Sequence, residues 1–247
     1  MSWFDAHCHL SEVAINYNIA DILKAADERG IKGWLSNALS REEVRWHLLN
    51  KDSRIKFSAG IHPVYDAGTT LTLDELDTLA KDKQVFAIGE IGLDKKNRKL
   101  DSQLKLLRDQ ISLARAYDLP CIFHMAGHLD EFYKILCDIP VRGIWHGFNA
   151  SREIVKQFSK FDITFSIGQM LITSLKNEVI NDIIKYGNFM IETDAPYNLK
   201  KPDKTADFNL NPLIELINYA RIVSRMNGVK TYSLELTISA NSKQYFT

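Results

Sequence analysis

The segment FDAHCHL, residues 4–10, points to the fold, because a short apolar run ends there in two histidines at alternate positions. Residues two apart in a strand share a face, so His7 and His9 lie on one face with Asp5, which is deeper along the strand. Cys8 takes the other face, where we expect it to pack in the core. Two imidazoles on one face can chelate a metal ion. Alone, such a pair is equally well explained by hydrogen-bonded core histidines.

Four further metal-competent side chains follow apolar runs downstream. They are Glu90 in VFAIGEIGLD, His124 in CIFHM, His146 in GIWHGF and Asp194 in MIETDAP. Each run predicts a strand, and each of these residues comes late in its strand, before the next predicted helix. The carboxyl ends of parallel barrel strands meet at one mouth. We therefore expect four histidines and two carboxylates to meet there and hold divalent metal.

Short β-branched or aromatic runs alternate with longer helical stretches along the whole chain. Strands are predicted near 3–9, 32–37, 55–61, 85–91, 120–125, 142–148, 162–167 and 189–194. Helices are predicted near 19–29, 40–50, 72–81, 101–117, 128–137, 151–159, 173–186, 211–226 and 231–245. Eight βα units in 247 residues predict one α/β domain over residues 1–247, a (β/α)8 TIM barrel of parallel strands with its metal site at the C-terminal mouth. The long irregular stretch 196–211 follows the eighth strand, where we expect substrate contacts.

Composition limits the partners of the protein. Lys+Arg and Asp+Glu are 31 each, so the formal net charge is zero and the pI is about 7.1. A protein that coats duplex DNA is usually basic, so we expect any nucleic-acid contact to be local and helped by bound metal. Three cysteines without a CxxC spacing argue against a disulfide framework and favour a reducing, cytoplasmic setting. We see no signal peptide and no apolar run near 18 residues, and so expect no membrane segment.

The two acidic candidates have distinct expected roles. Glu90 lies between glycines that let the backbone pass close to a ligand, after a run typical of a buried strand. A buried carboxylate is costly unless it is paired or coordinated, and a carboxylate can bridge two ions; the alternative is a surface-loop glutamate. We interpret Asp194 as the reactive carboxylate. Glu192, of the same parity, is deeper support or, more simply, one half of a barrel-interior ion pair.

The remaining histidines divide by position. His62, in GIHP after the third predicted strand, lies at the mouth, where it either positions substrate, delivers a proton or structures the loop. His128 opens the fifth predicted helix, and we expect a solvated side chain near the mouth. His47 lies in a predicted outer helix, and we expect no role in the site.

Oxygen and imidazole ligands without thiolate suit zinc, manganese, magnesium or nickel. Two such ions about 4 Å apart clamp the attacking and leaving oxygens of a phosphodiester and generate hydroxide from bound water. The chain has no Walker loop, no nucleotide-type GxGxxG and no GxSxG elbow. A covalent serine or cysteine mechanism therefore has no support in the sequence.

The motifs DAHCHL, AGIHP, IGEIGLD, IFH, WHGF and IETDAPY, in this order, resemble the TatD family of metal-dependent deoxyribonucleases, within the amidohydrolase-like superfamily. The resemblance covers residues 4–246. It implies a (β/α)8 barrel with two divalent ions, such as magnesium, manganese or zinc. It further implies 3′→5′ exonuclease activity on DNA, on single strands or 3′ ends. One ion would be held by His7, His9, Glu90 and Asp194, and the other by Glu90, His124 and His146. Asp194 would also orient or deprotonate the attacking water.

This chain departs from the family pattern on the substrate side. The arginine often found two residues after the fifth-strand histidine is replaced by Ala126, and the usual RGxxN segment after ETDAPY is absent. Lysines near the mouth either replace lost phosphate contacts as point charges or are solvated loop residues; they are Lys95, Lys96, Lys200, Lys201 and Lys204. Two alternatives stay open: a hydrolase of a small ester, amide or phosphoester, and a partner-dependent nuclease subunit of a bacterial defence system.

Overall fold

The computed structural model describes residues 2–64, 68–197 and 211–246, and its strands form one parallel sheet in chain order. The strands are β1 Trp3–Cys8, β2 Ile31–Ala38, β3 Ile55–Ala59, β4 Ala87–Asp94, β5 Cys121–Ala126, β6 Gly143–Trp145, β7 Ile163–Ile167 and β8 Phe189–Ile191. Two hydrogen bonds complete the ring beyond β8: Asp194 N–H donates to His7 O (2.8 Å) and His9 N–H donates to Ala195 O (2.7 Å). The predicted TIM barrel is confirmed.

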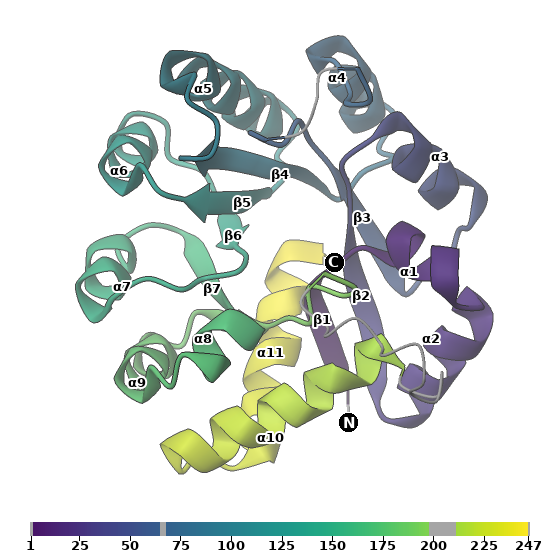
Figure 1. The fold of residues 1–247 in the computed structure, drawn as a ribbon, viewed down its shortest axis with the longest axis vertical. Helices are drawn as coiled ribbons and strands as arrows, with labels where there is room; N and C mark the ends of the chain where they lie inside the picture. Colours follow the sequence, from purple (N-terminus) through teal and green to yellow (C-terminus); the bar gives the residue numbers. More distant parts are fainter. Residues whose placement is uncertain (1, 65–67, 198–210, 247) are drawn as a thin grey trace.

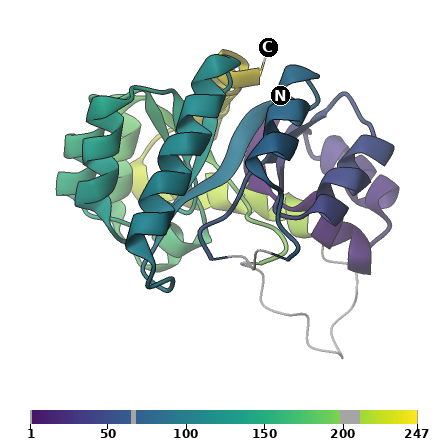
Figure 2. The same ribbon diagram turned by 90° about the horizontal axis from the view of Figure 1, so that it is seen from above.

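Helices form the outer layer of the barrel (Figures 1 and 2). They are α1 Leu10–Asn16, α2 Ile19–Glu28, α3 Arg41–Leu49, α4 Leu73–Lys81, α5 Leu100–Ala116, α6 Leu129–Asp138, α7 Arg152–Phe158, α8 Gln169–Thr173, α9 Asn177–Tyr186, the 3-10 turn η1 Pro212–Ile214, α10 Glu215–Asn227 and α11 Thr231–Phe246. Side-chain caps begin α2, α3 and α4, at Asn18, Ser40 and Thr72. None of the described helices has the length and apolar character to cross a bilayer.

Two short helices differ from the sequence prediction. Helix α1 follows β1 directly, and its seven residues are too few for a clear helical period. The helix predicted over 173–186 corresponds to α9, which begins four residues later, at Asn177. The five residues of α8 were not predicted as a helix, and Leu175, with a left-handed φ of 53°, separates α8 from α9. Of the expected substrate loop 196–211, residues 198–210 lie outside the described part of the chain, and the three lysines predicted there lie outside it too.

The end of the barrel opposite the metal-competent residues is closed by α11, which lies behind the strands in Figure 1. Tyr245 and Phe246 pack there against side chains from six strands: Ala6, Leu35, Ala87, Ile122, Ile144 and Met190. Tyr245 Oη also donates to Gly143 O at 3.1 Å, so its polar atom is satisfied in the core. The strand ends at the mouth are thereby left as the open end of the barrel.

Strand β4 is longer than predicted, and this places its polar residues differently. Glu90 lies in the middle of β4, and Asp94 is its last residue. The glycines beside Glu90 allow close packing against β5: a Cβ at Gly89 would lie 2.5 Å from Ile122 Cβ, and one at Gly92 would lie 1.8 Å from His124 O. Close contact between strands, and not only access to a ligand, therefore requires these glycines.

Candidate metal centre

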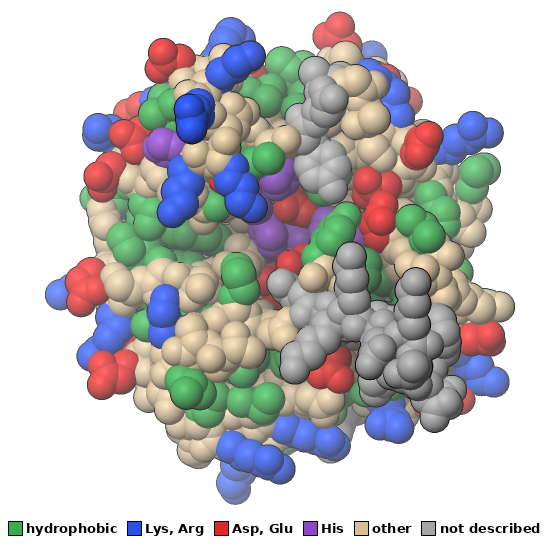
Figure 3. Space-filling model, viewed as in Figure 1, with side chains coloured by type: hydrophobic (Ala, Val, Ile, Leu, Met, Phe, Trp, Pro, Cys, Tyr) green, Lys and Arg blue, Asp and Glu red, His purple; other side chains and the backbone are tan. Residues whose placement is uncertain are grey.

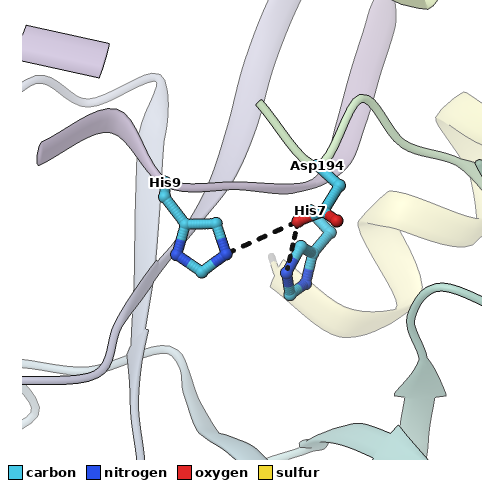
Figure 4. A group of neighbouring side chains, drawn as sticks. All are labelled: His7, His9 and Asp194. Carbon is cyan, nitrogen blue, oxygen red and sulfur yellow. Dashed lines mark ion pairs between the residues drawn. The ribbon is translucent and has the colours of Figure 1, made fainter. Parts of the chain in front are cut away.

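Three donor atoms meet at the mouth, at the carboxyl ends of the first and last barrel strands (Figure 4). His7 is in β1, His9 precedes α1, and Asp194 follows β8 with a left-handed φ of 52°, a conformation that aspartate tolerates better than most residues. Asp194 Oδ1 lies 3.6 Å from His7 Nε2 and 3.6 Å from His9 Nε2. The closure of the barrel through Asp194 N–H thus also positions its carboxylate.

Glu90 completes this first group. Its Oε1 atom lies 3.2 Å from both His7 Nε2 and His9 Nε2. Two ligand atoms bound tetrahedrally to one ion, at about 2.1 Å each, are about 3.4 Å apart, so this spacing fits a shared ion. His7 Nε2 and Glu90 Oε1 are buried and have no hydrogen-bond partner among the described residues. Buried polar atoms without hydrogen bonds are rare, and here they point to a common centre.

The second carboxylate oxygen of Glu90 faces a different group of donors. Glu90 Oε2 lies 3.0 Å from His146 Nε2 and 3.8 Å from His124 Nδ1, and these two nitrogens are 3.1 Å apart. His62 Nε2 is 3.7 Å from the same oxygen. Glu90 therefore stands between two clusters, with one oxygen directed to each, which is the arrangement of a bridging carboxylate.

Two side chains that the sequence analysis missed orient the histidines. Asp94 Oδ2 lies 3.1 Å from His124 Nε2, which turns Nδ1 toward Glu90. The Asn37 side-chain amide lies 3.0 Å from His7 Nδ1, which turns Nε2 toward Glu90. An acceptor on the far nitrogen, as Asp94 is for His124, is the usual support of a metal-binding histidine. The amide nitrogen of Asn37 is instead a donor, so Asn37 holds the ring of His7 in place through Nδ1. Asp94 shares the strand parity of Glu90, and that period-two relation is the signal that could have found it.

Asp5 lies one layer below the mouth, as the alternation in FDAHCHL predicts. Its carboxylate accepts hydrogen bonds from Thr193 Oγ1 (2.6 Å), Thr193 N (3.0 Å) and His7 N (3.2 Å). Burial raises the pKa of Asp5 to about 7, although these hydrogen bonds oppose the rise. Asp5 therefore ties β1 to the segment after β8 and fixes the separation of His7 and Asp194.

The electrostatics of the centre balance charge within it. Burial lowers the pKa of His9, but the facing carboxylates of Asp194 and Glu90 outweigh this and raise that pKa to about 10. Burial also lowers the pKa of His146, but the nearby carboxylate of Glu90 outweighs this effect and raises that pKa to about 9. Burial raises the pKa values of Glu90 and Asp194, yet the facing histidines bring both below their usual range. The negative charges of two carboxylates are thus matched by two cationic imidazoles, and a divalent ion can supply the same positive charge in their place.

His62 differs from the other mouth histidines in its ring tautomer. Its Nδ1 accepts a hydrogen bond from Val64 N–H at 3.2 Å. Burial lowers the pKa of His62 to about 3, so the ring is neutral near pH 7. A neutral ring whose Nδ1 accepts carries its proton on Nε2, the nitrogen that faces Glu90. In this tautomer Nε2 is a hydrogen-bond donor in the site. In the other tautomer Nε2 is one of three donor atoms, with those of Glu90 and His124, that could hold an ion.

The other residues named from the sequence fall outside the two clusters or support them. The structure shows no ion pair at Glu192 among the described residues; instead, Glu192 Oε1 accepts from Gly147 N–H at 2.6 Å and so holds the turn after His146. His47 is buried behind β2, with Nε2 3.1 Å from Ser36 Oγ. His128 is half-exposed at the start of α6. Glu192 also forms a group with His7 and His146 whose donor atoms could hold an ion, whereas His47 and His128 belong to no such group among the described residues.

Viewed into the mouth, histidine and acidic side chains line a hollow near the centre of the molecule (Figure 3). Side chains of the centre are largely buried: Glu90 is 4% exposed and Asp194 is 16% exposed. The more exposed carboxylate thus faces the open side. A parallel barrel with imidazole and carboxylate donors grouped at its C-terminal mouth defines the class of metal-dependent hydrolases.

The family follows from comparison with known proteins. The family model described as TatD related DNase matches residues 4–247, and the chain belongs to this family of metal-dependent hydrolases. It is 28% identical to "Uncharacterized metal-dependent hydrolase YabD" of Bacillus subtilis, over 81% of this chain and 82% of that protein. It is 30% identical to "Putative deoxyribonuclease TATDN1 homolog" of Encephalitozoon cuniculi, over 60% of this chain and 54% of that protein. The crystal structure of the TatD homologue YjjV from Escherichia coli matches with a TM-score of 0.79 at 22% identity, covering 99% and 97% of the two chains.

Proposed function

We propose that the protein hydrolyses phosphodiester bonds of DNA, removing nucleotides from a 3′ end, with two divalent ions held at the barrel mouth. The observation that carries the proposal is Glu90, whose two oxygens face two separate groups of donor atoms. The proposed ligands are His7, His9, Glu90 and Asp194 for one ion, and Glu90, His124 and His146 for the other. The name of the Encephalitozoon cuniculi relative, a putative deoxyribonuclease, supports DNA as the substrate.

The chain supplies the groups that such a reaction needs. Divalent ions bound at the mouth supply Lewis-acid stabilisation of the phosphoryl group and a water of lowered pKa. Asp194 is ionised near pH 7, because the facing imidazoles of His9, His7 and His146 hold its pKa below its usual range, although burial opposes this. Its partial exposure lets it accept a proton from a water at the open side of the site. We assign Asp194 the role of general base.

His62 is placed to assist on the substrate side. Its Nε2–H points into the site near Glu90 Oε2, 3.7 Å away, and can donate to a phosphoryl oxygen of the scissile group. A neutral donor of this kind stabilises charge that develops in the transition state without giving up its proton. Of the three roles open from the sequence, this geometry supports substrate positioning.

Further features concern the cellular compartment and the alternative functions. All three cysteines are free thiols, which supports a reducing compartment such as the cytoplasm. A second candidate function, hydrolysis of a small phosphoester, is favoured by Ala126, a side chain that cannot hold a phosphate at the end of β5. A partner-dependent nuclease would share the same metal centre and would differ only in needing a second protein for turnover.

The decisive experiment uses single-stranded oligonucleotides with a label at either end, incubated with metal-free protein and added Mg²⁺, Mn²⁺ or Zn²⁺. The proposal predicts a ladder of 5′-labelled products that shorten stepwise, and release of a mononucleotide from 3′-labelled DNA. A small diester, bis(p-nitrophenyl) phosphate, is tested in parallel. Hydrolysis of that diester without cleavage of any oligonucleotide would favour the small-phosphoester alternative, and inactivity on both with every metal would refute the proposal.

A further inference from the structure

A basic segment lies at the rim of the metal centre, directly after β4. Residues 95–99, KKNRK, contain four cationic side chains in five positions, and all four are exposed: Lys95, Lys96, Arg98 and Lys99. Within the described part of the chain, the charged side-chain groups of these four residues form no ion pair within 4 Å. Basic residues elsewhere on the surface are often paired, as Arg41 is with Glu75 at 2.7 Å.

The backbone of this segment is fixed against the site. Lys96 N–H donates to Asp94 Oδ1 at 2.7 Å, and the other oxygen of that carboxylate holds His124. Asn97 Nδ2 donates to Pro63 O at 2.7 Å, next to His62 in the chain. Buried Gln103 donates through Nε2 to Asn97 O at 2.8 Å. The charges are therefore carried on an ordered turn, whose position relative to the donors of the centre is set by hydrogen bonds.

Lys95 also reaches the neighbouring strand end. Its backbone N–H donates to Ala126 O at 3.3 Å, and its side-chain stem lies along Gly127, where an added Cβ would be 3.3 Å from Lys95 Cβ. The stem is thus held near the point where β5 ends. In the view of Figure 3, Lys and Arg side chains lie beside the histidine-lined hollow on the side of β4 and β5.

We propose that Lys95, Lys96, Arg98 and Lys99 bind the sugar–phosphate backbone of a single-stranded polynucleotide outside the metal centre. Four unpaired cations on a fixed turn attract phosphates in succession and do not distinguish bases. The net charge of the whole chain is zero, so a group of cations at one edge of the site attracts phosphates mainly at that edge, where the strand enters. The inference rests on the proposed function in taking the strand to end at the metal centre.

The test measures binding separately from cleavage. Fluorescence anisotropy follows labelled dT12 and dT3 on the Asp194→Asn protein, which holds substrate without turnover if the proposed function is right. Replacing all four cations with serine is expected to weaken dT12 binding at 100 mM salt by about two to three orders of magnitude, and to change dT3 binding much less. Each lost contact flattens the slope of log Kd against log salt by about 0.7, so four contacts flatten it by about 2.8. Turnover of bis(p-nitrophenyl) phosphate by the protein that retains Asp194 should be unchanged by the four serines.

A matched control removes four exposed cations from the other end of the barrel. Lys81, Arg115, Lys156 and Lys185 each lie in the last turn of a helix, on α4, α5, α7 and α9, away from the strand ends that form the mouth. Their replacement with serine changes the net charge by the same amount. The control should bind dT12 as the parent does.

The outcomes separate this inference from the proposed function. If the wild-type chain cleaves DNA but the mouth variant and the control bind dT12 equally well, the inference is overturned and the proposed function stands. If no DNA is cleaved yet the mouth variant alone loses dT12 binding, the inference survives and the proposed function fails. Absence of dT12 binding to the parent protein overturns the inference.

Discussion

Asp94 provides the sharpest test of the second metal group, because it contacts one proposed ligand only. Its Oδ2 lies 3.1 Å from His124 Nε2, and its Oδ1 accepts from Lys96 N–H at 2.7 Å. Asp94→Asn keeps the shape and removes the charge. The amide can accept from one of these two donors, and its NH2 group then faces the other, so one contact becomes a donor–donor contact. The side chain is 4% exposed, so water cannot readily repair the loss.

The expected magnitude follows from that single contact. A hydrogen bond to a charged group contributes about 1.5–3 kcal/mol, against about 1 kcal/mol for a neutral one. Loss of the charge therefore weakens the interaction between residue 94 and His124 by about 1–2 kcal/mol. This agrees with the 10–100-fold fall in metal affinity, about 1.4–2.8 kcal/mol, that is typical when such a partner of a metal ligand is removed. We expect the ion held by His124 and His146 to bind about 10–100-fold more weakly, and the ion held by His7 and His9 to be unaffected.

Calorimetric titration of Zn²⁺ or Mn²⁺ into metal-free protein, with a competing chelator, resolves the two affinities. Asn37→Ala is the reciprocal control, since Asn37 contacts His7 Nδ1 and should weaken the other ion instead. Circular dichroism of each variant checks that the barrel is intact. Equal weakening of both ions by Asp94→Asn would show an effect of charge on the whole cluster, and unchanged affinities would show that His124 does not bind metal through Nδ1; either result refutes the assignment.

The remaining predictions concern four other residues. Asp194→Asn should abolish turnover of oligonucleotides while the circular dichroism spectrum stays unchanged. Full activity of this variant would show that Asp194 is not the base. Glu90→Ala should lose both ions in metal analysis, and retention of two ions would show that Glu90 does not bridge them. His62→Gln should keep both ions and lower kcat/KM for DNA at least about tenfold, as expected for one hydrogen-bond donor to the transition state, whereas loss of an ion would make His62 a ligand. The folded-state pKa of His47, lowered to about 3 by burial, lies below its unfolded value of 6.5, so the unfolded chain binds more protons between these pH values and stability falls as pH falls through that window. In urea unfolding of metal-free protein, His47→Gln should therefore lose about 2 kcal/mol less than wild type between pH 7 and pH 5, and parallel losses would refute this.

The sequence predicted the barrel because its signals are local. Period-two alternation placed His7 and His9 on one face, and the repeated order of strand and helix left few topologies for eight units. The prediction that His146 lies at the mouth used only the apolar run before it and the point where that run ends. Each of these inferences uses neighbours in the chain, and the structure brings together all six residues selected in this way.

The period-two relation to Glu90 could have placed Asp94 on the same face of its strand, but the partners of Asp94 and Asn37 could not be predicted, because they depend on the register between strands. Asn37 reaches His7 from β2, and Asp94 reaches His124 from β4, across a pairing whose register shifts between Gly89 and Ile91. No pattern within one strand reports such a shift. The length of β4 was underestimated for a related reason: two glycines lower strand propensity locally, but close packing against β5 favours them.

Burial explains why the sequence indicates the chemistry of this protein more firmly than its substrate. A carboxylate as buried as Glu90 tolerates few surroundings, because its charge must be balanced by cations or coordinated, and that requirement limits the residues around it to donors such as His9 and His146. The rim has no such requirement. The half-buried Ala126 and the exposed side chains of the basic segment at 95–99 are compatible with the same barrel whatever residue stands there. Substrate preference therefore resides in the positions that the fold constrains least, and binding measurements on that segment test it more directly than further analysis of the metal centre.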